Sequence, residues 1–249
     1  ALALSPEDLP ELIARAFAVF DSERPRPVHI SVPLDVLAAK VARDWTGEVR
    51  RRPARGPAAA ADIQQAADTL RKAKRPMIIA GGGALHAAEQ LRVLSTRLGA
   101  VCFSSVAGKG LLPEEAPLNA GATLCVEPGW QLISQADVVL AVGTEMADTD
   151  YWRERLPLNG ELLRLDIDPR KFNDFYPCSV ALHGDARATL DAFSRPCHLH
   201  RPKRGRRFMR WPICARRCRT GRGPCSRFTA RSCNALPPSC RSTALSPAT

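Results

Sequence analysis

Short unbroken runs of apolar residues recur along the middle of the chain. Residues 77–80 (MIIA) form the first run, which follows Pro76, contains two β-branched residues and leads into three glycines. Residues 137–143 (DVVLAVG) and 162–168 (LLRLDID) have a similar layout. Such runs are typical of strands in a parallel sheet that helices cover on both faces, because both sides of each strand then meet apolar surface. We therefore predict that these three segments are strands of one buried sheet.

Helical stripes of apolar residues separate these predicted strands. Between Ile63 and Leu70 apolar side chains stand at positions i, i+3, i+4 and i+7, which is the spacing of one helix face. A second stripe predicts a helix over residues 84–98 that buries Leu85 and is ended by Gly99. Strands and helices therefore alternate along this part of the chain.

Two shorter patterns complete this region. Residues 101–105 (VCFSS) and 180–182 (VAL) predict further strands, and Asp185 is placed to cap a helix in the following sequence ARATLDAF. The connections between the strands are too long for hairpins, so neighbouring strands are expected to run parallel. Residues 62–193 are therefore predicted to form an α/β domain, a doubly wound parallel sheet with right-handed crossovers.

The first 43 residues carry a smaller pattern of their own. Ser5 and Pro6, followed by two acidic residues, predict the start of a helix. Residues 27–33 (PVHISVP) alternate apolar and polar side chains, which predicts a strand. One helix and one strand cannot enclose a core. We therefore expect residues 1–43 to be the end of a domain that begins before Ala1.

Residues 44–61 and 194–249 lack any apolar period. The first of these segments contains two prolines, two glycines and a cluster of arginines, which predicts a linker. Lys and Arg number 36 against 25 Asp and Glu, but 13 of the basic residues and none of the acidic ones lie in residues 197–249. Like charges without an apolar face cannot offset the entropy lost on folding. We predict that residues 194–249 are a disordered basic tail, with a composition typical of GC-rich coding sequence read in another frame.

The cysteines are divided in the same way. Three of the nine stand singly before residue 196, which favours a reducing, cytoplasmic compartment. The other six lie in the tail without the two close pairs that structural zinc sites use. No apolar run approaches the roughly 18 residues of a membrane helix, and the acidic amino end is unlike a signal peptide. We therefore expect a cytoplasmic protein with no membrane partner and no metal ligands of its own.

Glycines follow the first predicted strand. Gly81, Gly82 and Gly83 allow a sharp turn that brings bare backbone N–H groups towards the next helix, where a phosphate can bind. The dinucleotide-binding pattern of three spaced glycines is incomplete, because its last glycine would fall at His86. Two interpretations stay open, a turn that faces a nucleotide and a plain tight turn of the kind that any doubly wound sheet needs.

Ligands of such sheets bind outside the carboxyl ends of the strands. Asp166 and Asp168 stand at one of these ends. Paired carboxylates can perform acid–base work or hold a metal, but a cap, a turn before Pro169, or a contact with ribose or adenine is the favoured interpretation. No catalytic residue is assigned. The candidate cofactor-binding residues are Gly81, Gly82, Gly83, Gly143, Asp166 and Asp168.

Six phrases of the sequence together resemble one family. They are, in chain order, PVHISVPLDV, RPMIIAGGGAL, VAGKGLLPEEAPLNAG, ADVVLAVGTEM, LLRLDIDPRKFNDFYP and HGDARATL. Over residues 1–193 they resemble the end of the pyrimidine-binding domain and the central domain of thiamine diphosphate-dependent enzymes of the acetolactate synthase group. The phrases GKGLLPE and DIDPRKFNDFYP are most similar to 2-oxo acid decarboxylases of the 5-guanidino-2-oxopentanoate type.

The resemblance implies thiamine diphosphate and Mg²⁺ as cofactors, a 2-oxo acid substrate and a homo-oligomer in full-length relatives. It also implies that the glycine turn and the DID segment lie where some relatives bind FAD or ADP. The family's cofactor-activating glutamate and its GDG segment for Mg²⁺ have no counterpart in this sequence. Gly184-Asp185-Ala186 is the nearest phrase, and it belongs to the part that resembles the central domain.

These observations predict a truncated thiamine diphosphate-dependent 2-oxo acid decarboxylase or acetolactate synthase-like protein that is inactive alone. A nucleotide-binding or purely structural α/β domain is the first alternative. The second alternative is nonspecific nucleic-acid binding through the basic tail, because clustered arginines attract phosphates without any fold.

Overall fold

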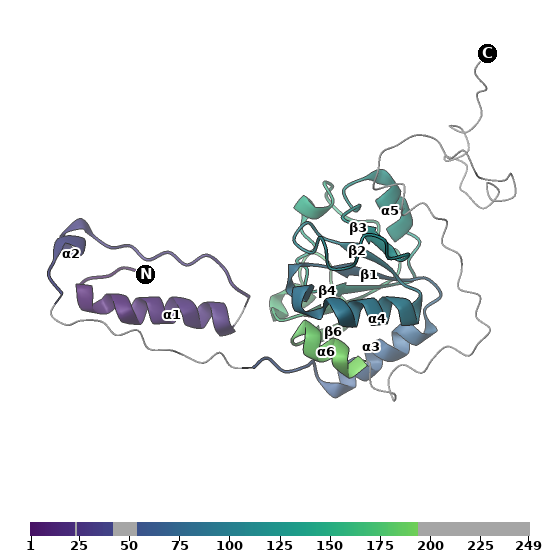
Figure 1. The fold of residues 1–249 in the computed structure, drawn as a ribbon, viewed down its shortest axis with the longest axis horizontal. Helices are drawn as coiled ribbons and strands as arrows, with labels where there is room; N and C mark the ends of the chain where they lie inside the picture. Colours follow the sequence, from purple (N-terminus) through teal and green to yellow (C-terminus); the bar gives the residue numbers. More distant parts are fainter. Residues whose placement is uncertain (23, 42–53, 194–249) are drawn as a thin grey trace, which may run out of the picture.

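A computed structural model describes residues 1–22, 24–41 and 54–193 of the chain. Its centre is a six-stranded sheet with the order β3-β2-β1-β4-β5-β6 (Figure 1). Every neighbouring pair of strands is parallel, which confirms the predicted fold class. The strands are β1 (Pro76–Ala80), β2 (Val101–Ser104), β3 (Asn119–Gly121), β4 (Val138–Val142), β5 (Glu161–Asp166) and β6 (Val180–His183).

The central strands are buried on both faces, as their unbroken apolar runs predicted. Every residue of β1 and β4 is buried, and Ile78 pairs with Leu140 in the parallel register. Ile78 and Leu140 belong to the core on one face of the sheet, whereas Met77 and Val139 belong to a second core on the other face. Each fully buried side chain of this size contributes roughly 1.5–3 kcal/mol.

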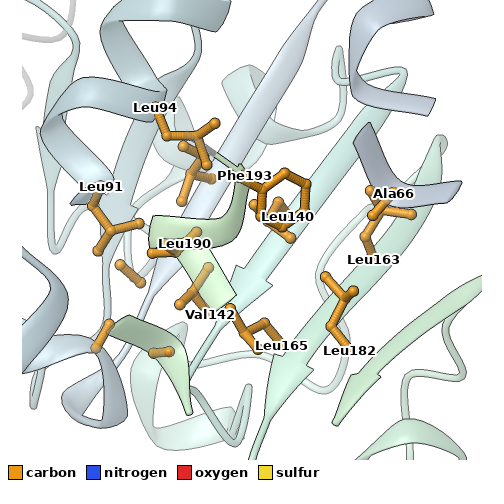
Figure 2. Close-up of a cluster of buried hydrophobic side chains, with 14 of the residues drawn as sticks. Ala66, Leu91, Leu94, Leu140, Val142, Leu163, Leu165, Leu182, Leu190 and Phe193 are labelled. Atoms are coloured by element: carbon orange, nitrogen blue, oxygen red, sulfur yellow. The ribbon is translucent and has the colours of Figure 1, made fainter. Parts of the chain in front are cut away.

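Helices cover the two faces unequally. The face that holds Leu140 and Leu165 is covered by three helices, which contribute Ala66, Leu91, and the pair Leu190 and Phe193 to the core drawn in Figure 2. The other face is covered mainly by loops and one short helix. The helices of the first face are α3 (Ala60–Lys72), α4 (Ala88–Leu98) and α6 (Ala186–Phe193), and that of the second is α5 (Glu127–Ile133).

The two halves of the sheet meet along β1 and β4, and the amino end of this junction is fixed by Asp137. Its carboxylate accepts hydrogen bonds from the backbone N–H groups of Lys74 and Arg75, at 2.5 and 2.8 Å. Its own carbonyl oxygen accepts a hydrogen bond from the N–H of Glu161 at 2.9 Å. One residue therefore sets the start of three adjacent strands.

The helix predicted over residues 84–98 is divided in two. The first turns form the 3-10 helix η2 (Gly82–Ala87), and α4 begins only at Ala88. Leu85 is 52% exposed instead of buried, because the tighter helix places it on the outer side. Gly99 ends α4 in the left-handed conformation with φ 64°, as predicted.

The strand β3 (Asn119–Gly121) lies in a stretch for which the sequence analysis predicted no strand. It is only three residues long and has no apolar run that could have predicted it. Asn119 holds it in place, since its side chain donates hydrogen bonds to the carbonyl oxygens of Leu112 and Pro113 and accepts one from the N–H of Gly121. The position of this strand is therefore set by the hydrogen bonds of a side-chain amide, and a search for apolar runs does not find it.

The segment before residue 42 contains the predicted helix, but the strand predicted over residues 27–33 was wrong. That stretch makes a single parallel bridge, between Ser31 and Leu2. A strand needs a neighbouring strand for its hydrogen bonds, and within the described residues only the first three offer one. The elements here are η1 (Pro6–Asp8), α1 (Leu9–Ser22) and α2 (Leu34–Ala38).

Apolar side chains of this amino-terminal segment stay largely exposed. Phe17 on α1 is 55% exposed and Leu34 on α2 is 83% exposed. The expectation that residues 1–43 end a larger domain is consistent with this exposure and stays a prediction. Most of the predicted linker, residues 44–53, and all of the predicted tail, residues 194–249, lie outside the described residues.

Within the part of the chain that the structure covers, none of the helices has the length and apolar character needed to cross a membrane.

Candidate functional site

The glycine turns after β1 and β4 meet at the carboxyl end of the sheet, where the strand order reverses. The N–H of Gly81 donates to the carbonyl oxygen of Val142, and the N–H of Gly83 donates to that of Gly143, both at 2.9 Å. A Cβ atom on Gly81 would lie 2.3 Å from the Gly143 oxygen. Gly143 itself has φ +55°, which favours glycine. These glycines therefore allow two backbones to touch.

Gly82 has different surroundings from its neighbours. A Cβ atom there would meet the side chain of Ala107, at 3.1 Å, before any backbone atom. Ala107 belongs to the loop after β2, so Gly82 stands between the carboxyl ends of β1 and β2. Of the three consecutive glycines, Gly82 is the one where added bulk meets a side chain rather than the backbone of the β4 turn.

The loop after β4 is held in a strained conformation. Met146 is buried and has φ 53°, a region that costs a non-glycine residue roughly 1–3 kcal/mol. Its N–H donates to the hydroxyl oxygen of Thr144 at 3.1 Å, and its carbonyl oxygen accepts a hydrogen bond from the Tyr151 hydroxyl. Burial raises the pKa of that phenol, so Tyr151 stays a hydrogen-bond donor.

Arg164 lies under this loop, within β5, and is 1% exposed. Its Nη2 donates to the carbonyl oxygen of Thr144 at 2.9 Å, and its Nη1 lies 3.5 Å from that of Tyr176. Burial lowers its pKa, against the opposing influence of Asp166. The guanidinium thus joins the loop after β4 to the loop before β6.

Asp166 and Asp168 both lie buried at the carboxyl end of β5. Asp166 accepts the N–H of Asp168 at 2.9 Å, and Asp168 accepts the N–H of Arg170 at 3.1 Å, which caps the 3-10 helix η4 (Pro169–Phe172). The predicted cap and turn are therefore both present. The side chain of Arg170 also donates to Asp168, and this hydrogen bond holds the pKa of the Asp168 carboxyl well below its usual range despite burial.

Arginines from the amino-terminal segment also reach this acidic end. Arg24 donates to Asp166 at 2.5 Å and to Glu145 at 2.9 Å, while Arg26 donates to Asp168 at 3.2 Å. Burial lowers the pKa of Arg24, but the hydrogen bond and charge of Asp166 outweigh it and the net change is upward. The ribose-binding interpretation of these aspartates requires that the arginines move.

The structure brings the six predicted candidate residues to the same edge of the sheet, in two groups. The glycines meet where β1 and β4 end, and the aspartates stand at the end of the adjacent strand β5. The sequence analysis missed Arg24, Arg26 and Arg164. Arg164 carried a signal, since it interrupts an otherwise apolar strand, whereas the pairing of Arg24 and Arg26 spans 142 positions of sequence.

The described residues contain no group of three or more His, Cys, Asp or Glu side chains that could hold a metal ion. Asp185 accepts the N–H of Ala188 at 2.8 Å and caps α6, as predicted. A Cβ on Gly184 would lie 2.4 Å from the backbone of Ala58, so this glycine allows close packing rather than ligand access.

A shallow hollow of about 300 Å³ opens at the opposite, amino end of β5 and β6. Arg155, Phe175 and Ser179 are among its lining residues, and the Arg155 guanidinium lies 4.1 Å from the centre of the Phe175 ring. It is lined by none of the candidate residues. The candidate site is therefore defined by strand ends and not by this hollow.

Comparison with known proteins agrees with this architecture. A probable 2-ketoarginine decarboxylase (AruI) of Pseudomonas aeruginosa is 72% identical over 192 residues, which are 77% of this chain and 34% of that protein. The acetolactate synthase isozyme 1 large subunit of Escherichia coli is 28% identical over 188 residues, 72% of this chain and 32% of that protein. This chain thus spans about a third of the length of these curated relatives.

A solved structure has the same fold. A putative thiamin diphosphate-dependent enzyme from Mycobacterium smegmatis superimposes with a TM-score of 0.64 and 27% identity, covering 82% of this chain and 40% of that one. Residues 63–193 match the family model of the thiamine pyrophosphate enzyme central domain. The chain therefore belongs to the thiamine pyrophosphate enzymes, and residues 63–193 are their central domain.

Proposed function

We propose that this chain supplies the central domain, and the adjoining end of the pyrimidine-binding domain, of a thiamine diphosphate-dependent decarboxylase of 2-ketoarginine. The observation that carries the proposal is the 72% identity to the Pseudomonas decarboxylase, set against 28% to an acetolactate synthase of similar coverage. Thiamine diphosphate and Mg²⁺, a 2-oxo acid substrate and a homo-oligomer are the corresponding cofactors, substrate class and assembly.

The contribution of the described residues is structural. Because they contain no cluster of His, Cys, Asp or Glu side chains for a metal ion, we infer that the cofactor chemistry belongs to other segments of such an enzyme. When bound, thiamine diphosphate supplies the electron sink for loss of carbon dioxide from a 2-oxo acid. We expect the chain on its own to show no turnover and no stoichiometric binding of the cofactor by calorimetry.

A chimera tests the decarboxylase proposal. Residues 1–193 replace the corresponding stretch of the Pseudomonas relative, and release of carbon dioxide from 2-ketoarginine is measured with thiamine diphosphate and Mg²⁺. We expect activity within a few fold of the unmodified relative. The same stretch taken from the E. coli synthase is the control, and it should abolish activity. A chimera that folds but does not release carbon dioxide from 2-ketoarginine would contradict the proposal.

A second candidate function is binding of an adenine nucleotide, FAD or ADP, at the junction of β1 and β4. The supporting observation is the strand order β3-β2-β1-β4-β5-β6, which places a topological switch point beside the glycine turns. Gly82 is the position to test, since the atoms nearest to a Cβ added there all belong to Ala107. Calorimetry with ADP should show binding that Gly82→Leu abolishes without loss of helical signal. If calorimetry detects no heat of ADP binding to the wild-type chain, this candidate is contradicted and the glycines serve only the packing of the two turns.

Nonspecific binding of nucleic acid through residues 197–249 is the third candidate, and it rests on their 13 basic residues. Removing these residues should lower the isoelectric point from about 9.7 to below neutral and reduce retention on heparin, with a steep dependence on salt. The melting temperature of the central domain should stay nearly unchanged. Equal heparin retention after the deletion would contradict this candidate.

A further inference from the structure

The acidic end of β5 is covered by side chains from a remote part of the sequence. Arg24 reaches Asp166, and Arg26 reaches Asp168, each across 142 positions. Glu145 on the loop after β4 accepts a hydrogen bond from the guanidinium of Arg24 at 2.9 Å. The same carboxylate oxygen lies 3.8 Å from Nη2 of Arg26. Two consecutive strands thus present carboxylates to one short stretch of chain.

That stretch is well shaped for such a contact. Proline at position 25 fixes its own φ angle and keeps the preceding residue extended, so Arg24 and Arg26 are held two positions apart in an extended backbone. Little backbone entropy is lost when the two guanidinium groups bind. Guanidinium groups also match carboxylates through a planar fork of donors, which an ammonium group cannot reproduce.

The Arg24–Asp166 pair is buried on both sides, whereas Arg26, which pairs with the buried Asp168, is itself 44% exposed. The side chains of Asp166 and Asp168 are 1% exposed and that of Arg24 is 17% exposed. Arg15 and Glu11 on α1 pair with 73% and 68% of their side chains exposed. Exposed pairs contribute little, whereas removing one partner of a buried pair leaves a charge without water or counter-ion.

Apolar contact does not explain how the segment is held. Leu4, Phe17 and Leu34 are all more than half exposed. The buried contacts of this segment with the central domain are therefore dominated by Arg24 and Arg26.

We propose that Arg24-Pro25-Arg26 is a docking element, and that Glu145, Asp166 and Asp168 form the acidic receptor that binds it. The element ties residues 1–41 to the carboxyl end of the central sheet. The receptor recognises two guanidinium groups spaced by one proline.

Hydrogen exchange of the full chain, followed by mass spectrometry, tests this proposal. In the variant Arg24→Ala/Arg26→Ala the amides of residues 28–41 should exchange at least about tenfold faster, because the untethered segment opens its own backbone hydrogen bonds more often. The amides of β1 and β4 should exchange as in the wild type, which shows that the domain is still folded. Arg24→Lys should give an intermediate rate, since it keeps the charge and loses the fork.

Two matched variants separate docking from a general loss of charge. Arg170→Ala also removes an ion pair from Asp168, but Arg170 lies within the central domain, so residues 28–41 should keep the wild-type rate. Arg15→Ala should likewise have no effect. If the double variant loses the β1 protection, the less buried Arg26→Ala variant replaces it. Wild-type exchange over residues 28–41 in the arginine variants, or an equal increase in Arg170→Ala, would overturn the proposal.

Discussion

The Nη2 atom of Arg164 donates a 2.9 Å hydrogen bond to the carbonyl oxygen of Thr144, which stands next to Gly143 in the turn after β4. Arg164 stands in the middle of β5 and is 1% exposed. A buried strand residue therefore fixes the loop that carries the strained backbone of Met146. This loop supplies Glu145 to the acidic receptor, so its shape matters for the candidate site.

We predict that Arg164→Met destabilises the domain by roughly 1–3 kcal/mol, because the Thr144 carbonyl oxygen is left buried without a donor. Urea unfolding followed by circular dichroism measures the loss. Arg187→Met on the exposed side of α6 is the control and should stay within about 0.5 kcal/mol of the wild type. Equal stability of both variants would show that the buried guanidinium does not support the loop.

The contact between the two glycine turns gives a second prediction. Gly81→Ala should destabilise the domain by roughly 1–3 kcal/mol, since the added Cβ would lie 2.3 Å from the Gly143 oxygen and the backbones must separate. Gly56→Ala should be neutral or slightly stabilising, because nothing lies within 4 Å of its Cβ position. Thermal unfolding of the two variants makes the comparison. A Gly81→Ala protein as stable as Gly56→Ala would contradict the close approach.

Asp168 makes stability depend on pH in acid. The hydrogen bond from Arg170, assisted by that from Arg26, holds its pKa in the folded chain below the value of about 3.9 in an unfolded chain. Such a depressed pKa stabilises the fold above pH 4, and the contribution is lost as the pH falls further and the carboxylate is protonated. Urea unfolding between pH 6 and pH 3 should show this fall.

The variant Asp168→Asn should flatten that fall, because it cannot be protonated. Glu154→Gln, on an exposed loop position, should reproduce the wild-type curve. A wild-type pH dependence in Asp168→Asn would mean that other carboxylates cause the acid instability.

Cys102 should react with thiol reagents only when the domain unfolds. It is buried in β2, and burial raises the pKa of its thiol to about 12, so almost no thiolate exists at neutral pH. Labelling mapped by mass spectrometry should modify the half-buried Cys125 first and Cys102 only in urea. Equal labelling rates for these two cysteines in the native protein would contradict the buried position of β2.

The sequence predicted the central sheet because its strands can be recognised without knowing their partners: β1 and β4 are unbroken apolar runs, and Arg164 alone interrupts the leucines of β5. The prediction from apolar patterns was wrong at two places, where other interactions decide whether a strand forms. The strand β3 depends on the side-chain hydrogen bonds of Asn119, and the alternation in residues 27–33 does not produce a strand where few neighbouring strand residues are available.

The candidate site was predicted as far as topology determines it. Parallel strands place their carboxyl ends together, so the glycines and aspartates could be grouped without coordinates. The partners of the aspartates could not be found in the same way. Arg24 and Arg26 precede the domain, and a contact between residues 142 positions apart cannot be predicted from the local spacing of apolar residues.

The junction between β1 and β4 is also a natural place to divide the domain. Residues 54–121 provide β1, β2 and β3, and residues 122–193 provide β4, β5 and β6, so a cut after Gly121 separates two three-stranded halves. Alone, each half would expose an unpaired strand edge. Together they would meet through Asp137 at one end and the Gly83–Gly143 hydrogen bond at the other. We therefore expect the two fragments, when mixed, to reassemble into a continuous sheet.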